Sequence, residues 1–131
     1  MTKGHCLCGA VTYAVGGKPN WTSHCHCGSC RRNSGSAVAT FVSFALIEFA
    51  VTQGQLSHYE SSPGVTRSFC PQCGSPMTYR SNSMPTEIHL FLGSLDNPEE
   101  FPAQAQVFCA EKLPWLSVDD HIPKFDAIPG Q

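Results

Sequence analysis

The sequence predicts a mainly β domain, built of antiparallel sheets with little helix. Three observations support this prediction. Short segments of about four to eight residues alternate between apolar and polar side chains, as strands with one solvated face do. Turn-forming pairs such as Gly16-Gly17 and Pro63-Gly64 separate the segments. No window of about twelve residues carries a helical apolar stripe.

Eight segments are predicted as strands, in the order 11–15, 37–44, 47–51, 55–59, 66–69, 77–80, 88–92 and 105–109. Two short helical turns are expected, at 28–32 and 98–101. The sequence contains no internal repeat and no linker. Residues 1–131 are therefore expected to form a single domain, with 122–131 as an extended tail rich in proline and glycine.

Seven of the eight cysteines fall into three tight clusters. Small secreted domains show a similar density because they carry disulfides. However, residues 1–8 contain no apolar run behind a basic stretch, so a signal peptide is not expected and the predicted location is the cytoplasm. In a reducing compartment, closely spaced cysteines are more often metal ligands. We therefore favour metal binding over disulfides.

Charge and hydropathy argue against two classes of partner, nucleic acids and membranes. Eight Lys and Arg residues are scattered along the chain, and the formal net charge is −2. Seven thiolates holding two Zn²⁺ ions would move it to about −5. No basic stripe is available for a nucleic-acid backbone, so we expect no nucleic acid. No apolar stretch reaches the ~20 residues of a membrane span, so we expect no membrane. The sequence makes no prediction of the oligomeric state.

The first and last cysteine clusters are predicted to form one structural zinc site. Each cluster ends in glycine, at Gly9 and Gly74, which lets the backbone fold back so that amide N–H groups point at the sulfurs. Two ligands from an N-terminal loop and two from a loop more than 60 residues later would complete a tetrahedron and stabilise the fold. The predicted ligands are Cys6, Cys8, Cys70 and Cys73.

The middle cluster supplies three thiolates, from Cys25, Cys27 and Cys30. Three protein ligands and one open position are the arrangement of a catalytic zinc. An alternative is that a nearby histidine or the remaining cysteine closes the tetrahedron, which would make the site a second structural one; the candidates are His24, His26 and Cys109. The sequence leaves both possibilities open.

Three motifs resemble those of glutathione-dependent formaldehyde-activating enzyme (GFA) and centromere protein V-type domains. Residues 4–13 match GxCxCGxVxY, 25–31 match CHCxxCR and 69–75 match FCxxCGS. The resemblance implies a β-tent fold, a structural zinc on the four cysteines and a catalytic zinc on the three. It also implies the family's named activity, a carbon–sulfur lyase reaction that condenses glutathione with formaldehyde to S-hydroxymethylglutathione.

From this resemblance we expect a small-molecule thiol and a small aldehyde as partners, with glutathione as co-substrate. His24 or His26 is the nearest candidate to accept the thiol proton, with His26 between two ligands. Arg31 or Arg32 could hold a glutathione carboxylate through a bidentate contact. His89 alternates with apolar neighbours and is expected to face solvent or the pocket rim.

Two other functions are compatible with the sequence. The first is a non-enzymatic, zinc-stabilised protein-binding module of the same fold, in which the middle cluster is closed or empty. The second is an enzyme with a different thiol or aldehyde substrate. A sealed second site beside an exposed apolar patch would favour the binding module. An accessible three-cysteine site in a small pocket would favour an enzyme.

Overall fold

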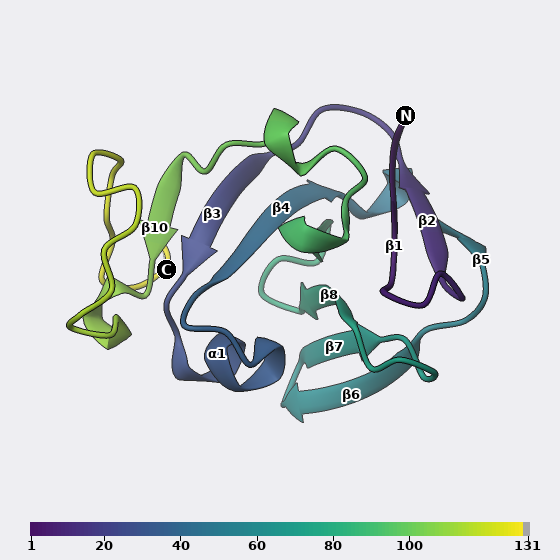
Figure 1. Cartoon of the computed structure of the whole chain (residues 1–131), viewed down its shortest axis with the longest axis horizontal. Coiled ribbons are helices and arrows are strands. Elements are labelled where there is room, and N and C mark those ends of the chain that lie inside the picture. The colour runs from purple at the N-terminus through teal and green to yellow at the C-terminus, as the bar shows by residue number, and fades with distance from the viewer. Residues whose placement is uncertain (130–131) are drawn as a thin grey trace.

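The computed structural model describes residues 1–129, which form two β-sheets (Figure 1). The smaller sheet has three antiparallel strands in the order β1-β2-β5. Its strands are β1 (Thr2–His5), β2 (Thr12–Val15) and β5 (Phe49–Gln53). The mainly β fold class predicted from the sequence is confirmed.

The larger sheet has seven strands in the order β10-β3-β4-β9-β8-β7-β6. They are β3 (Trp21–Cys25), β4 (Ala39–Ala45), β6 (Ser57–Ser62), β7 (Val65–Phe69), β8 (Pro76–Ser81), β9 (Glu87–Phe91) and β10 (Ala105–Val107). Its pairs are antiparallel except β10 with β3, which is parallel, so the prediction of purely antiparallel sheets is wrong at this edge. The cause is the connection after β9, which carries the chain back to the start of β3, where Gln104 N donates to Thr22 O.

Within residues 1–129 the helices are α1 (Gly28–Ser34) and four single turns, η1 (Leu46–Glu48), η2 (Leu92–Ser94), η3 (Pro98–Glu100) and η4 (Cys109–Glu111). The Cys27 sulfur caps the start of α1 by accepting from Cys30 N. Gly35, at a φ of 68°, ends the helix in the left-handed region. Both predicted helical turns are therefore present.

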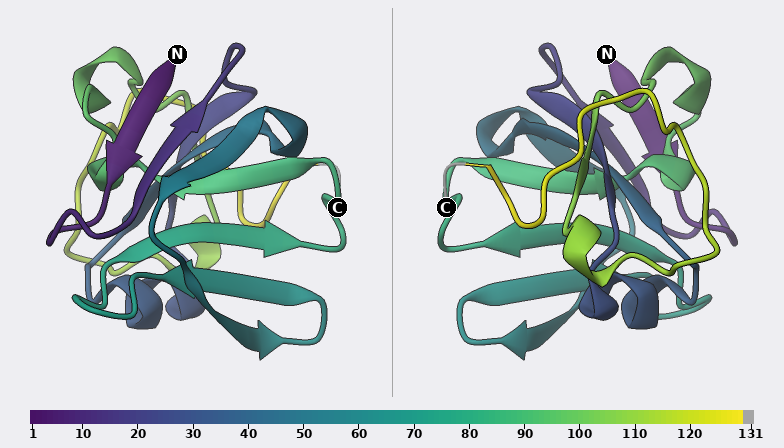
Figure 2. Two further views of the ribbon diagram at one scale, coloured as in Figure 1. Left: turned by 90° about the vertical axis from the view of Figure 1, so that its right-hand side faces the viewer. Right: turned by 90° about the vertical axis from the view of Figure 1, so that its left-hand side faces the viewer.

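The main core lies between the two sheets. Its largest fully buried side chains include Tyr13, Phe44, Met77 and Leu90, and Figure 2 shows the small sheet standing against one side of the large one. Tyr13 reaches across to the chain after β9, where its hydroxyl lies 2.6 Å from Ser94 Oγ. Buried apolar area supplies the main stabilisation of such a core.

A second, smaller cluster lies on the opposite face of the large sheet. It consists of Cys30 of α1 and of Cys25, Ala39, Phe41 and Phe91. Successive strand side chains point to opposite faces, so residues such as Val42 and Leu90 enter the main core while Phe41 and Phe91 face the other way. This second face carries the candidate site.

The C-terminal segment runs beside β10, as Figures 1 and 2 show in yellow. Gln106 N donates to Pro123 O, and Phe125 N donates to Gln106 O, each at 2.9 Å. The predicted tail 122–131 is described only as far as Pro129; Gly130 and Gln131 lie outside the described residues. None of the helices in the described part of the chain is long and apolar enough to cross a membrane.

Gly54→Ala is expected to destabilise the fold by about 2 kcal/mol or more, because Gly54 has a φ of +77° and a Cβ there would lie 2.2 Å from the Ala10 carbonyl oxygen. Gly93→Ala is the matched control, since a Cβ there meets no atom within 4 Å. Urea unfolding of both variants measures the difference. Equal midpoints would contradict the close approach of the two backbone segments.

Candidate metal centres and active-site pocket

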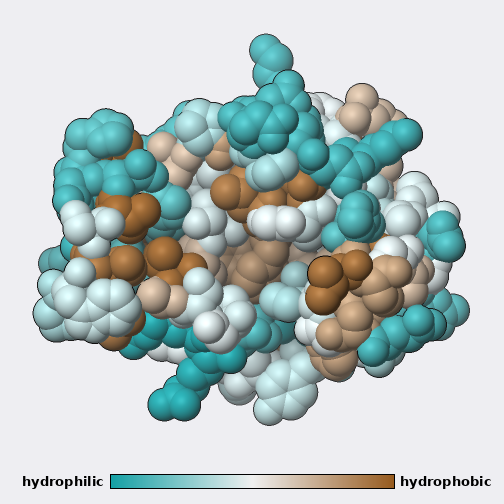
Figure 3. Space-filling model, in the orientation of Figure 1, coloured by the Kyte–Doolittle hydropathy of each residue, from teal (hydrophilic) through white to brown (hydrophobic). Residues whose placement is uncertain are grey.

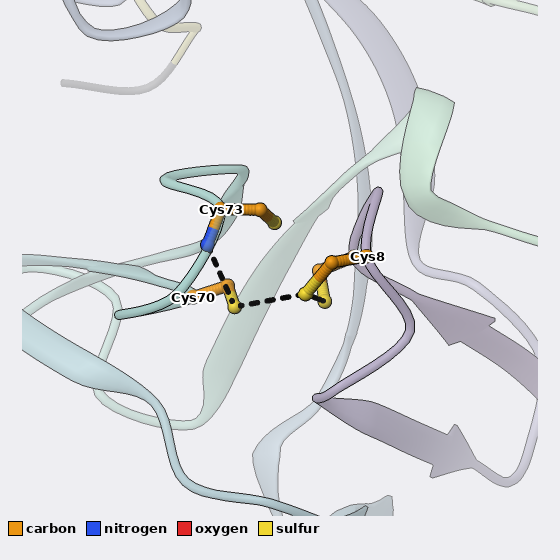
Figure 4. Close-up of side chains that lie close together, drawn as sticks. Cys8, Cys70 and Cys73 are labelled. Carbon is orange, nitrogen blue, oxygen red and sulfur yellow. Dashed lines mark hydrogen bonds between the residues drawn. The ribbon is translucent and has the colours of Figure 1, made fainter.

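The four predicted structural ligands come together at one end of the fold. Cys6 and Cys8 lie on the loop after β1, while Cys70 and Cys73 lie on the loop after β7, and Figure 4 shows the two loops facing each other. All four sulfurs lie within 4.8 Å of one another. Cys8 Sγ lies 3.6 Å from Cys6 Sγ and 3.8 Å from Cys70 Sγ. A Zn–S bond of ~2.3 Å implies tetrahedral S–S edges of about 3.8 Å, so this group fits zinc.

Backbone amides surround this first group. Gly9 and Gly74 have φ values of 80° and 77°, and both loops fold back at these glycines. Val11 N donates to Cys6 Sγ at 3.3 Å, and Gln72 N and Cys73 N donate to Cys70 Sγ at 3.4 and 3.5 Å. Such amide donors stabilise the negative charge of thiolates.

The second group contains Cys25 at the end of β3 and Cys27 and Cys30 at the start of α1. Cys25 Sγ lies 3.5 Å from Cys27 Sγ and 3.4 Å from Cys30 Sγ, and all three sulfurs are within 4.8 Å of one another. Hydrogen bonds from the Cys25 and Cys30 thiols hold the pKa of Cys27 well below its ordinary value. Three soft donors at this spacing also fit zinc.

Neither neighbouring histidine joins the second group. On β3, His24 points to the face opposite Cys25, and its Nδ1 and Nε2 lie 2.7 and 2.6 Å from Thr40 Oγ1 and Asp119 Oδ2. Cys109 is also outside both metal-compatible groups found among the described residues. In residues 1–129 the second group therefore has three protein ligands.

His26 is fully buried and does not line the pocket. The Gln106 amide donates to two backbone carbonyls, so its Oε1 accepts from His26 Nε2 at 2.6 Å. This bond leaves the proton on Nε2, and burial lowers the pKa of the ring. His26 Nδ1 is buried without a hydrogen-bond partner. A proton role for His26 stays a prediction. Its hydrogen bond to Gln106 joins the residue that follows β3 to β10.

The three cysteines face a pocket of about 830 Å³ on the second face of the large sheet. That volume lies within the range of small-molecule sites. Aromatic side chains of Trp21, Phe41 and Tyr79 form much of its wall, and Ile128 of the C-terminal segment lies at its edge. The second cysteine group is therefore accessible from a cavity.

Strand register places a row of pocket residues side by side. Arg67 on β7 pairs with Tyr79 on β8, Tyr79 pairs with His89 on β9, and His89 pairs with Ser43 on β4. Ser43 in turn pairs with Trp21 on β3. Directly paired positions project to the same face of a sheet, so the members of the row that line the pocket, Arg67, Tyr79, His89 and Trp21, share one wall of it. Arg67 and Tyr79 leave no signal in the sequence, because only the strand register brings them together.

Arg67 brings a positive charge into contact with the second group. It is only 6% exposed, and its Nη1 and Nη2 lie 3.8 and 3.9 Å from Cys30 Sγ. Its Nε donates to Ser61 Oγ at 3.1 Å, and its guanidinium lies 5.1 Å from the centre of the Tyr79 ring. The Arg67 charge also favours the Cys27 thiolate.

His89 is the histidine among the described residues that lines the pocket. His89 is 6% exposed, so the expectation that it faces solvent is wrong. Its position in the pocket wall agrees with the other expectation, that it lies at the pocket. Its Nε2 lies 3.0 Å from Glu87 Oε1, which also accepts from Ser43 Oγ at 2.7 Å. Burial lowers the pKa of His89, so its imidazole is mostly neutral at pH 7.

The two predicted arginines lie at α1. Arg31 Nη1 donates to His26 O at 2.5 Å and to Glu111 O at 2.7 Å, and the second bond connects α1 to η4. Arg32 is exposed on the same helix. Neither residue lines the pocket, and their role in holding a carboxylate stays a prediction.

Comparisons with known proteins agree with this description. The family model described as glutathione-dependent formaldehyde-activating enzyme matches residues 1–111. A crystal structure of a Rhodobacter sphaeroides protein is similar, with a TM-score of 0.61 and 22% identity, over 93% of this chain and 98% of the other. At that identity the likeness supports the fold alone. None of the curated proteins compared with the chain matches it.

Fold and site together define a class of protein: a two-sheet β domain with one four-cysteine and one three-cysteine metal-compatible group, the second facing a pocket. The family match covers most of the chain and includes both cysteine groups. The chain belongs to the glutathione-dependent formaldehyde-activating enzyme (GFA) family.

Proposed function

We propose that the chain is a zinc-dependent carbon–sulfur lyase that adds a glutathione-like thiol to a small aldehyde such as formaldehyde. The observation that carries this proposal is the second cysteine group, which offers three ligands among the described residues and faces a cavity. Structural zinc sites are normally closed by four protein ligands, whereas catalytic sites leave one position open.

In this proposal the two metal groups have different roles. Cys6, Cys8, Cys70 and Cys73 hold a structural zinc between the two sheets, and Cys25, Cys27 and Cys30 hold a catalytic one. A zinc ion bound by three thiolates would favour ionisation of a thiol at neutral pH and polarise nearby groups. Glutathione would be the co-substrate.

The chain's own residues would position the reactants. Arg67 brings a buried positive charge to the cysteine end of the pocket, where thiolate and oxyanion charge would gather. Trp21, Phe41 and Tyr79 line the cavity and would limit the access of water to the reacting groups. The His89–Glu87 pair offers a neutral imidazole in the same wall, able to exchange a proton with a bound substrate.

The pocket volume also supports a thiol of some size. A cavity of about 830 Å³ is in the upper part of the range for small-molecule sites. Formaldehyde alone would fill a small fraction of it, which leaves room for a tripeptide thiol. The accessible second site favours an enzyme over the protein-binding module.

The face shown in Figure 3 gives the binding module little support. Figure 3 shows that, on the face it displays, polar residues divide the hydrophobic ones of the described chain into separate groups. The exposed large apolar side chains are Met1, Leu7, Ile47, Val51, Tyr59, Trp115 and Phe125. Protein-docking sites are usually contiguous apolar patches.

The test is the exchange rate between free formaldehyde and S-hydroxymethylglutathione, measured by magnetisation-transfer NMR with zinc-loaded protein. A rate is needed because the uncatalysed reaction already proceeds. We expect exchange at least tenfold faster than in buffer with free zinc at the same concentration. Rates equal to that control, for glutathione and for smaller thiols, would reject the lyase function.

A further inference from the structure

Among residues 1–129, no carboxylate pairs with the buried charge of Arg67. Within residues 1–129, the recorded ion pairs with acidic side chains are all formed by histidines, His5, His24 and His89. A buried arginine almost always has an anionic partner, because an uncompensated charge in the interior is costly. The groups that face the guanidinium are one sulfur, one hydroxyl and one aromatic ring.

We propose that Arg67 is the counter-charge of the three-cysteine group and thereby a positioning residue that sets the zinc affinity of that group. Both terminal nitrogens of its guanidinium lie at nearly equal distances, 3.8 and 3.9 Å, from the single sulfur of Cys30. This symmetrical approach is the fork geometry that arginine uses toward anions. The proposal rests on the metal-binding part of the proposed function and needs no catalytic activity.

Charge counting explains why this group needs a cation. Three thiolates and one Zn²⁺ ion leave one negative charge uncompensated. Cys25 and Cys30 are 7% and 4% exposed, so water contributes little to stabilising that charge. Arg67 supplies one positive charge beside the sulfurs, which makes the loaded site neutral overall.

Four thiolates and one Zn²⁺ ion would leave two negative charges on the four-cysteine group, which backbone amides and solvent can stabilise. At the three-cysteine group, Cys30 N donates to Cys27 Sγ. The sulfurs of the four-cysteine group accept from the backbone amides of Val11, Gln72 and Cys73. Cys8 is exposed, so solvent can also screen the charge there. A buried cation is therefore expected to matter at the second group and not at the first, and the first group serves as an internal control.

Neighbouring residues hold Arg67 in place. Ser61 on β6 accepts from Nε, and the Tyr79 ring on β8 lies beside the guanidinium, so each strand flanking β7 contacts the side chain. Lysine could supply the charge at this position, but it could not span the sulfur, the hydroxyl and the ring with fixed donors.

The experiment compares zinc affinity in the full chain with that in Arg67→Met, Arg67→Lys and Arg80→Met, using competition with a chromophoric chelator. Arg80→Met is the matched control because Arg80 is an exposed arginine on the adjacent strand β8. Each variant is also prepared with Cys27→Ser, so that the four-cysteine group is titrated alone. Circular dichroism checks that each variant is folded.

We expect Arg67→Met to weaken zinc binding at the three-cysteine group about 10–100-fold, as loss of a residue that supports metal ligands typically does. Arg67→Lys should lose less than tenfold because it keeps the charge. The four-cysteine affinity and the Arg80→Met values should match those of the unaltered chain. A native zinc affinity in Arg67→Met, or equal losses in the Met and Lys variants, would overturn the counter-charge role.

The same measurements distinguish failure of the lyase function from failure of the counter-charge role. A chain that binds two zinc ions, weakens at the second group on Arg67→Met, and shows no thiol–aldehyde exchange would retain this inference and reject the activity. A chain whose three-cysteine group binds no zinc would reject both.

Discussion

Cys27→Ser is expected to abolish catalysed thiol–aldehyde exchange and to lower the zinc content from two equivalents to one, while the fold stays intact. Cys27 belongs to the three-cysteine group, whose removal leaves the main core and the four-cysteine group untouched. Serine is nearly the same size but is a poor zinc ligand at neutral pH. The expected loss of rate enhancement is complete within the precision of the exchange measurement.

Cys109→Ser is the matched control for this variant. Cys109 is the cysteine outside both groups and does not line the pocket. It should keep both zinc equivalents and the full exchange rate. If Cys27→Ser exchanged as fast as the unaltered chain, the three-cysteine group would not be the active site. If it unfolded, the separation of the two metal groups into structural and catalytic roles would be wrong.

Cys70→Ser is expected to leave the chain largely unfolded at 25 °C. Cys70 is fully buried, and its group joins the loop after β1 to the loop after β7, 62 residues apart at Cys8 and Cys70. Structural zinc contributes about 10–16 kcal/mol in small zinc domains, as much as the whole stability of a typical domain. Far-UV circular dichroism and a thermal melt would detect the loss.

Zinc removal gives an independent route to the same result. A strong chelator should unfold the unaltered chain and Cys27→Ser at similar concentrations, because both depend on the same four-cysteine group. A cooperative melt of Cys70→Ser close to that of the unaltered chain would contradict the structural role of this group. It would mean that the apolar core alone sustains the fold.

Much of the fold could be predicted because its strands follow simple alternation. The predicted segments overlap β2 and β4 to β10, with no boundary shifted by more than three residues. β1 and β3 were missed, since Thr2–His5 is mostly polar and Trp21–Cys25 carries hydroxyl, imidazole and thiol groups instead of an apolar pattern. These two segments form strands because of pairing and packing with neighbouring strands and the cysteines beside them, and not because of an apolar alternation.

For the site, the sequence predicted which residues carry sulfur but not what surrounds them. Cysteine spacing separates four ligands from three, because ligand geometry is local and leaves a pattern. Arg67, Tyr79 and His89 lie in separate strands, and their contact depends on register, which alternation alone does not set. The turn of His24 away from Cys25 follows from strand alternation once β3 is known.

The separation of each metal group's surroundings along the chain has a consequence for biosynthesis. A chain leaves the ribosome from its N-terminus, so Cys6, Cys8 and the middle cluster emerge well before Arg67, Cys70 and Cys73. The contacts of His26 and Arg31 are completed only by residues 106–119. Five thiols are therefore synthesised before the residues that complete the surroundings of each site, and until then they are exposed to oxidants and to competing metals.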